Sequence, residues 1–263
     1  MEITLIQAII LSVWGFIAGT DRMSEAFFWF RPIIVSTVSG IILQDPVNGA
    51  IVGGLTELAF AGLTPAGGAV PPDPVVAGIM GAVFACCTDV GPTAAVGLAL
   101  PFSVLMQYIV MLMYTAYLGF MKKLDQLIED VNIKGMIRMN ILGLVFVGLS
   151  YMIFTFLAAY LMQDVISSLI DIIPTWVMHG LEVAGGVMPA LGFAMLLTTM
   201  FKIEYTPFLI IGFLAATFGG FANILPVALI GLAFALYNYF FGNKEKSESG
   251  SHTEIEGDYS NGI

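Results

Sequence analysis

The most constraining feature of this 263-residue sequence is a long central stretch without basic side chains. No Lys or Arg occurs between Pro32 and Met121. The acids of the stretch are Asp45, Glu57, Asp73 and Asp89. Over the whole chain 11% of residues are charged, against roughly 25% in an ordinary soluble domain. Because a soluble domain needs more solvated surface than this, we expect an all-α, polytopic membrane protein.

Within this stretch the segment Gly53–Pro74 is apolar, rich in glycine and proline, and carries two carboxylates. In hydrocarbon every peptide group must be hydrogen-bonded internally, so interrupted backbone is tolerated only where it packs within protein or lines a wet cavity. A second Gly/Pro-interrupted region is Ala184–Pro189. Two such regions are typical of transporters with broken helices, and Gly53–Pro74 is the first candidate for a substrate site.

The membrane transport domain is expected to cover residues 1–241, in two parts joined by a cytoplasmic connector at 122–140. A full crossing needs about 20 apolar residues. Crossings are predicted at Ile3–Thr20, Thr93–Met121, Ile141–Met162, Leu181–Phe201, Pro207–Ala222 and Asn223–Phe241. Shorter apolar pieces, expected to form half-helices or re-entrant hairpins, are Pro32–Leu43, Gly49–Leu63 and Val75–Thr88.

Charge patterning suggests how these segments are oriented. The connector Lys122–Asn140 carries Lys122, Lys123, Lys134 and Arg138, so the positive-inside tendency places it in the cytoplasm. The amphipathic segment Gln163–His179 is expected to lie in the membrane interface or against a partner. The acidic tail at 242–263 contributes much of the net charge of −10 and is expected to be disordered. No basic, aromatic-rich patch indicates a nucleic-acid partner.

The sequence gives no support for catalysis by this chain alone. It has no Gly-x-x-x-x-Gly-Lys-Ser/Thr phosphate loop. Cys86 and Cys87 are adjacent, and two cysteines alone form neither a metal site nor a disulfide framework, so both are expected to be small buried groups. We therefore expect no catalytic residue, no metal and no cofactor.

Glu57 is the strongest candidate for a ligand contact. An ionisable group in an apolar membrane segment costs free energy unless it is paired or hydrated. Its carboxylate can accept two sugar hydroxyls, and Gly53 and Gly54 would let backbone and ligand approach closely. The alternative is a structural carboxylate bound to a backbone amide or to a basic residue.

Other polar residues could complete such a site. Thr56 and Thr64 could add hydroxyl contacts. Asp73 is either a ligand carboxylate or a helix cap for Val75 onward. Gln107 could bind a sugar or join two helices.

Two further groups have alternative roles. His179 and Glu182 would share one face of a helix, where they could relay protons, contact a sugar or form a satisfied pair. Arg22 and Arg31 flank an aromatic patch, where each is expected to reach the membrane interface or to pair with Asp21, Asp45 or a lipid phosphate.

Three motifs together resemble a known family. They are Gly53-Gly-Leu-Thr-Glu-Leu-Ala-Phe-Ala-Gly-Leu-Thr-Pro-Ala-Gly-Gly68, Phe30-Arg-Pro-Ile-Ile34 and His179-Gly-Leu-Glu-Val-Ala-Gly-Gly186. The chain resembles the IIC subunit of mannose-class permeases of the bacterial phosphoenolpyruvate-dependent sugar phosphotransferase system. Within this class, the first motif and the terminal Asp258-Tyr-Ser-Asn-Gly-Ile263 are most similar to galactosamine and N-acetylgalactosamine permeases.

The resemblance implies a subunit of the bacterial cell membrane that moves a hexosamine by an elevator-like shift. It also implies a IID membrane partner, a multimer of IIC–IID pairs, and cytoplasmic IIA and IIB proteins that carry the phosphate. Gly53, Gly54 and Glu57 match the family's Gly-Gly-x-x-Glu, and Pro72 and Asp73 its Pro-Asp element. Mannose-type relatives tend to have His where this chain has Phe30, which fits a different sugar preference.

Two other functions compete with this one. An ion-coupled secondary sugar transporter would use Glu57 and Asp73 as proton sites, with His179 and Glu182 on the same path. A structural or receptor subunit would leave sugar binding to its partner. The form in which sugar arrives inside the cell, free or phosphorylated, separates the first competitor from a phosphotransferase subunit.

Overall fold

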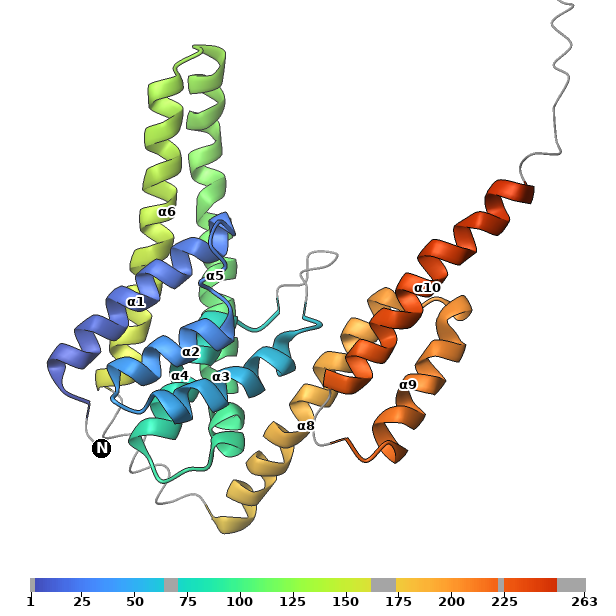
Figure 1. The fold of residues 1–263 in the computed structure, drawn as a ribbon. Helices are drawn as coiled ribbons and strands as arrows, with labels where there is room; N and C mark the ends of the chain where they lie inside the picture. Colours follow the sequence, from blue (N-terminus) through green and yellow to red (C-terminus); the bar gives the residue numbers. More distant parts are fainter. Residues whose placement is uncertain (1–2, 64–70, 162–173, 222–224, 250–263) are drawn as a thin grey trace, which may run out of the picture. The chain divides into compact units, whose positions relative to one another are not determined.

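The computed structural model describes residues 3–63, 71–161, 174–221 and 225–249, and these ranges are helical with no strand. The chain divides into two compact units, Met1–Thr199 and Met200–Ile263. Figure 1 labels the helices in chain order. The all-α prediction is therefore confirmed. Thr64, most of Gln163–His179 and Asn223 lie outside the described residues.

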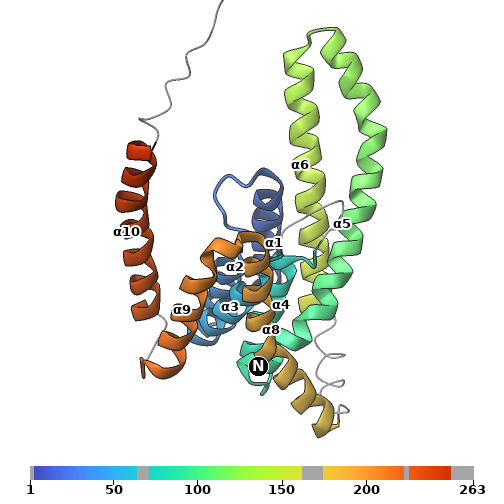
Figure 2. The ribbon, with the colours of Figure 1, turned by 90° about the vertical axis from the view of Figure 1, so that its right-hand side faces the viewer.

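Helix α1 (Leu5–Ser24) packs along α6 (Ile133–Phe156) (Figure 2). It begins at a capping box in which Thr4 accepts from the Gln7 amide, and it ends at Glu25 in the left-handed region. A Cβ on Gly19 would lie 2.3 Å from the Tyr151 ring. The glycine therefore allows the close approach of the two helices that is typical of small residues in membrane proteins.

Helices α2 (Pro32–Ile42) and α3 (Pro46–Phe60) form the short hairpin predicted from their length. The turn between them covers only residues 43–45, because Asp45 caps α3 by accepting from the Asn48 amide and Pro46 opens the helix. The two helices come closest at Gly40 and Gly49, where an added Cβ would lie within 2.8 Å of the facing backbone.

Helix α4 (Pro74–Cys87) is the centre of the first unit. All residues from Val75 to Ala85 are buried, and the helix contacts α1, α2, α3, α5 and α6. This explains its continuous apolar sequence, because the helix is covered on every side rather than on one face.

Helices α5 (Pro92–Glu129) and α6 form a long antiparallel hairpin, followed by a π-helical turn at Leu157–Leu161. The Tyr117 hydroxyl of α5 donates to the Gly143 carbonyl of α6. The charged connector predicted at 122–140 belongs mostly to these two helices, since the turn between them spans only residues 130–132. Both views show the outer part of this hairpin extending beyond α1–α4 (Figures 1 and 2).

Helix α8 (Thr175–Met200) is continuous through Gly185, Gly186 and Pro189. The prediction of an interrupted segment at Ala184–Pro189 is therefore wrong. A long apolar helix tolerates isolated glycines, and a proline costs the one backbone hydrogen bond for which it lacks the donor.

The second unit contains a 3-10 turn (Ile203–Tyr205), α9 (Thr206–Phe218) and α10 (Leu225–Ser249). The rings of Phe208 and Phe234 lie 5.8 Å apart and join the two helices. Helix α10 continues past Phe241 and so includes the first residues of the segment expected to be a polar tail.

Three helical segments of the described residues are long and apolar enough to cross a membrane. They are Pro92–Glu129, Ile133–Tyr160 and Thr175–Met200. Pro32–Ile42, Pro74–Cys87, Ile203–Phe218 and Leu225–Phe240 are shorter apolar helices.

Candidate functional site

A cavity of about 220 Å³ lies where four helix ends meet in the first unit. The C-terminal ends of α1 and α3 and the N-terminal ends of α2 and α4 form its walls, and Tyr114 of α5 completes it. Its lining residues are Arg22, Met23, Glu25, Phe30, Arg31, Pro32, Glu57, Phe60, Leu63, Pro71, Pro72, Pro74 and Tyr114.

Glu57 lines this cavity and is the last residue of the element Gly53-Gly-Leu-Thr-Glu57. Its carboxylate forms an ion pair with Arg31 and accepts the Ile33 amide at 3.2 Å. Ile33 lies in the first turn of α2. The N-cap residue Arg31 makes no side-chain capping hydrogen bond, so Glu57 of α3 provides the negative charge that stabilises the positive end of the helix dipole. The side chains of Arg31 and Glu57 are 47% and 18% exposed, so the pair is open to a ligand.

Asp73 forms a similar but fully buried arrangement at the start of α4. One carboxylate oxygen accepts the Val76 amide at 2.8 Å, and the other pairs with Arg22 and accepts the Tyr151 hydroxyl at 2.5 Å. Arg22 in turn donates to the Tyr151 oxygen at 2.9 Å. Asp73 therefore acts as the helix cap that was one of its two predicted roles, and it also fixes Arg22.

The backbone around Asp73 is equally well bonded. Its amide donates to the Ser103 carbonyl at 3.1 Å, and the Ser103 hydroxyl donates to the Asp73 carbonyl at 2.9 Å. Asp73 is completely buried, whereas its neighbours Pro72 and Pro74 line the cavity. The Pro-Asp-Pro sequence thus gives the cavity a rigid wall with the carboxylate turned into the protein.

Several other predicted site residues lie away from this cavity. Thr56 is buried, and its hydroxyl donates to the Val52 carbonyl of its own helix. Gly53 lies against Ile33, where an added Cβ would approach the backbone to 3.0 Å, while the same test on Gly54 finds open space. Gln107 is half-buried on α5 and is not among the cavity-lining residues.

His179 and Glu182 lie on one face of α8, as their spacing predicted, with the imidazole Nδ1 3.8 Å from the carboxylate. They line a different cavity of about 580 Å³, together with Cys87 to Gly91, Ala94, Thr175 and Met178. The predicted residues therefore belong to two separate places in the first unit.

Sequence reasoning did not assign the two arginines and Tyr151 to the site. Arg22 and Asp73 are 51 positions apart by their numbering, and Tyr151 is 78 positions from Asp73. The available signal was charge balance, because acids in a membrane segment require cationic partners, and Arg22 and Arg31 are the basic residues that precede Glu57 and Asp73 in the sequence.

The arrangement offers hydrogen-bonding groups of both kinds beside an apolar surface. The Glu57 carboxylate has lone pairs left after its two protein contacts, and the guanidinium of Arg31 has donors to spare. Phe30, Phe60 and Leu63 provide the apolar part. Such a site can hold a small polyhydroxylated molecule that also carries apolar faces. Among the described residues, no group of three or more His, Cys, Asp or Glu side chains could hold a metal ion.

A family model described as the sorbose-specific IIC component of the phosphotransferase system matches residues 5–237. The chain is 46% identical to N-acetylgalactosamine permease IIC component 1 of Escherichia coli, covering 100% of this chain and 99% of that protein.

Two solved structures are also similar. One, described as the structure of a membrane protein, has a TM-score of 0.85 and 26% identity over 93% of this chain and 99% of the other. The second is a cryo-EM structure of the mannose transporter ManYZ in complex with microcin E492, with a TM-score of 0.58 and 27% identity over 91% and 96% of the two chains.

Proposed function

Because the chain belongs to the family of sorbose-specific IIC components of the sugar phosphotransferase system, we propose that it imports N-acetylgalactosamine. It is a multi-pass membrane subunit for transport, and phosphorylation of the sugar is done by other components of the system. The choice of sugar rests on the 46% identity of the full chain to the N-acetylgalactosamine permease subunit.

The cavity offers an N-acetylated sugar both apolar and polar contacts. An acetamido group would place its methyl against Phe30, Phe60 or Leu63 and its polar atoms toward Arg31. The sugar hydroxyls would donate to Glu57. Galactosamine would add an ammonium group instead, for which Glu57 and Glu25 are the nearest acids lining the cavity.

The two carboxylates then have different roles. Glu57 contacts the sugar directly from its partly exposed position. Asp73 acts through Arg22, which lines the cavity and is fixed by the buried ion pair. His179 and Glu182 line the second cavity, where they would contact the sugar at a later stage of its passage.

The chain works with partners in this proposal. A IID membrane subunit pairs with it, and cytoplasmic IIA and IIB proteins deliver phosphate to the sugar as it reaches the inner side. An elevator-like shift of the unit that carries the cavity would bring the sugar inward. Phosphorylation makes the product an anion, which prevents its return across the apolar barrier.

The sugar preference is tested in cells that lack other amino-sugar uptake and that produce this chain with its IID, IIA and IIB partners. The half-saturating concentration is measured for N-acetylgalactosamine, galactosamine and mannose. We expect N-acetylgalactosamine to be favoured by about tenfold, the effect of roughly one well-buried methyl and one hydrogen bond. Equal or better uptake of either other sugar would overturn the assignment.

A substitution at the cavity wall sharpens this experiment. Phe30→His exchanges an apolar wall for a polar one, so we expect the preference for N-acetylgalactosamine over mannose to fall. Phe27→His is the matched control, because Phe27 is exposed in the same loop and does not line the cavity. An identical effect of both substitutions would show that Phe30 does not select the sugar.

The second candidate function, an ion-coupled transporter with Glu57 and Asp73 as proton sites, is not favoured. Family membership argues against it. Asp73 also has both oxygens bonded to protein groups and is closed to the cavity.

A further inference from the structure

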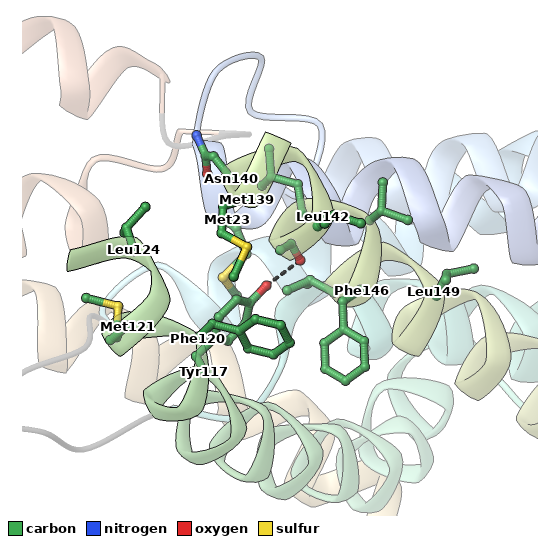
Figure 3. Close-up of a pocket in the computed structure, with 14 residues that line it drawn as sticks. Met23, Tyr117, Phe120, Met121, Leu124, Met139, Asn140, Leu142, Phe146 and Leu149 are labelled. Carbon is green, nitrogen blue, oxygen red and sulfur yellow. Dashed lines mark hydrogen bonds between the residues drawn. The ribbon is translucent and has the colours of Figure 1, made fainter. Parts of the chain in front are cut away.

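A larger cavity of about 570 Å³ lies between the long helices α5 and α6 (Figure 3). Met23 is the one lining residue that it shares with the cavity around Glu57, the proposed sugar site, which is called the sugar cavity below. Its walls are Met, Leu, Val and Phe side chains, and the side-chain oxygen and nitrogen atoms among its lining residues belong to Tyr117 and Asn140. The Tyr117 hydroxyl is already engaged with the Gly143 carbonyl (Figure 3). The groove is therefore suited to an apolar occupant.

Basic residues stand at one end of this groove. Lys122 and Lys123 directly follow Met121, which lines it, and Arg138 directly precedes Met139, which lines it from the other helix. All three side chains are exposed. Among the ion pairs of the described residues, none involves these three cations.

The acids of the hairpin lie farther out. Asp125, Glu129 and Asp130 are closer to the turn than the lysines that precede them on α5. From the membrane outward, α5 thus passes from apolar to basic and then to acidic residues. Basic side chains at the edge of an apolar segment lie at the depth of lipid headgroups, where they attract anionic lipids.

The nature of the walls distinguishes a lipid from another protein helix. Helices that pack closely in membranes meet at small residues, but this groove is lined by long, flexible side chains such as Met121, Met139 and Leu142. The one glycine, Gly143, is covered by Tyr117, whose hydroxyl would lie 2.9 Å from an added Cβ. Methionine walls adapt to a flexible chain.

We propose that the groove between α5 and α6 binds one acyl chain of an anionic phospholipid, whose phosphate is held by Lys122, Lys123 and Arg138. Both helices are long and apolar enough to cross a membrane, which would bring acyl chains within reach of the groove. A bound lipid would fill the space between the two helices near the turn that joins them.

The proposal is tested on the intact complex of this chain with its membrane partner, in native membranes. Two photoactivatable lipids with the same labelled acyl chain are compared, phosphatidylglycerol and phosphatidylethanolamine. We expect phosphatidylglycerol to label the peptides around residues 117–124 and 139–149 about tenfold more strongly. Equal labelling by the two lipids would overturn the headgroup assignment, and absence of label from these peptides with both lipids would show that the groove holds no acyl chain.

Charge variants provide the second arm. The triple substitution Lys122→Gln, Lys123→Gln, Arg138→Gln should lower phosphatidylglycerol labelling to the phosphatidylethanolamine level. Asp125→Asn with Glu129→Gln is the matched control on the same hairpin and should not lower it. An excess of unlabelled phosphatidylglycerol should displace the label from the unaltered complex, which tests the site even if the triple variant assembles poorly. Undiminished labelling in an assembled triple variant, or no displacement, would refute the site.

Discussion

At the scale of single residues, the sugar cavity is built from two carboxylates that do similar work in different surroundings. Glu57 and Asp73 each accept a backbone amide from the first turn of a helix, and each pairs with an arginine. The Glu57 pair is partly exposed, whereas Asp73 is fully buried. A partly exposed ion pair can be broken by a ligand at a small cost in free energy, whereas breaking a buried ion pair costs several kcal/mol. We therefore assign binding to Glu57 and support to Asp73.

Glu57→Gln should impair transport without impairing assembly. A partly exposed ion pair contributes about 0–1 kcal/mol to stability, but a hydrogen bond from a ligand to a charged group contributes about 1.5–3 kcal/mol. We expect the half-saturating sugar concentration to rise by roughly ten- to a hundredfold. Uptake of labelled sugar and the yield of the assembled complex are measured together. Glu129→Gln at the end of α5 is the control, and unchanged sugar affinity in Glu57→Gln would remove the residue from the site.

Asp73→Ala should act mainly on stability. Removing one partner of a buried pair costs about 3–5 kcal/mol because Arg22 is left uncompensated. Tyr151→Phe removes the two hydrogen bonds that its hydroxyl makes with Asp73 and Arg22 but leaves the ion pair in place, so it should cost less, about 1–3 kcal/mol. Thermal unfolding of the purified complex in detergent measures which of the two substitutions destabilises the protein more. The double substitution Arg22→Met, Asp73→Asn should be less damaging than the sum of its parts, and strict additivity would show that the two side chains do not depend on each other.

At the scale of the helices, the hairpin of α2 and α3 depends on glycines that let the two helices pack closely. Gly40 and Gly49 bring the two backbones so close that a Cβ on either would lie within 2.8 Å of the other helix. Gly53 makes a similar contact with Ile33. This packing sets the position of Glu57 against the first turn of α2. Gly53 of the motif therefore serves helix packing, whereas an added Cβ on Gly54 would meet open space.

A pair of alanine substitutions on one helix tests this role. Gly49→Ala should force α2 and α3 apart and lower the midpoint temperature of unfolding, and it should weaken sugar binding by moving Glu57. Gly54→Ala should be neutral or slightly stabilising, because nothing lies within 4 Å of its added Cβ and alanine favours a helix by about 1 kcal/mol over glycine. Equal effects of the two substitutions on unfolding and on uptake would contradict this account of the hairpin.

How far the sequence predicts these elements depends on whether the signal is local. Asp45-Pro46 and Asp73-Pro74 each open a helix through a cap and a proline at the first position, and such a signal is contained within a few residues. The length of the apolar segments likewise indicates a short hairpin. Gly53 and Gly54 were expected to let a ligand approach the backbone, but Gly53 packs against Ile33 of α2, a contact that has no local signal in the sequence. The pairing of Arg22 with Asp73 depends on how α1 and α4 pack and has no local signal.

At the scale of the whole molecule, composition and the absence of catalytic motifs agree with a division of labour. The chain provides a membrane path with a polar cavity, and other components of the system carry out phosphorylation. Transport and chemistry are then coupled only through the sugar itself. The energy for uptake should come from phosphoenolpyruvate and not from an ion gradient.

The most direct test of this claim follows labelled N-acetylgalactosamine into membrane vesicles. The vesicles contain this chain with its IID partner and enclose the phosphocarrier proteins, with or without phosphoenolpyruvate. We predict that all accumulated label is phosphorylated, that uptake continues when a protonophore collapses the proton gradient, and that it stops without phosphoenolpyruvate. Accumulation of free sugar that disappears with the proton gradient would contradict the account.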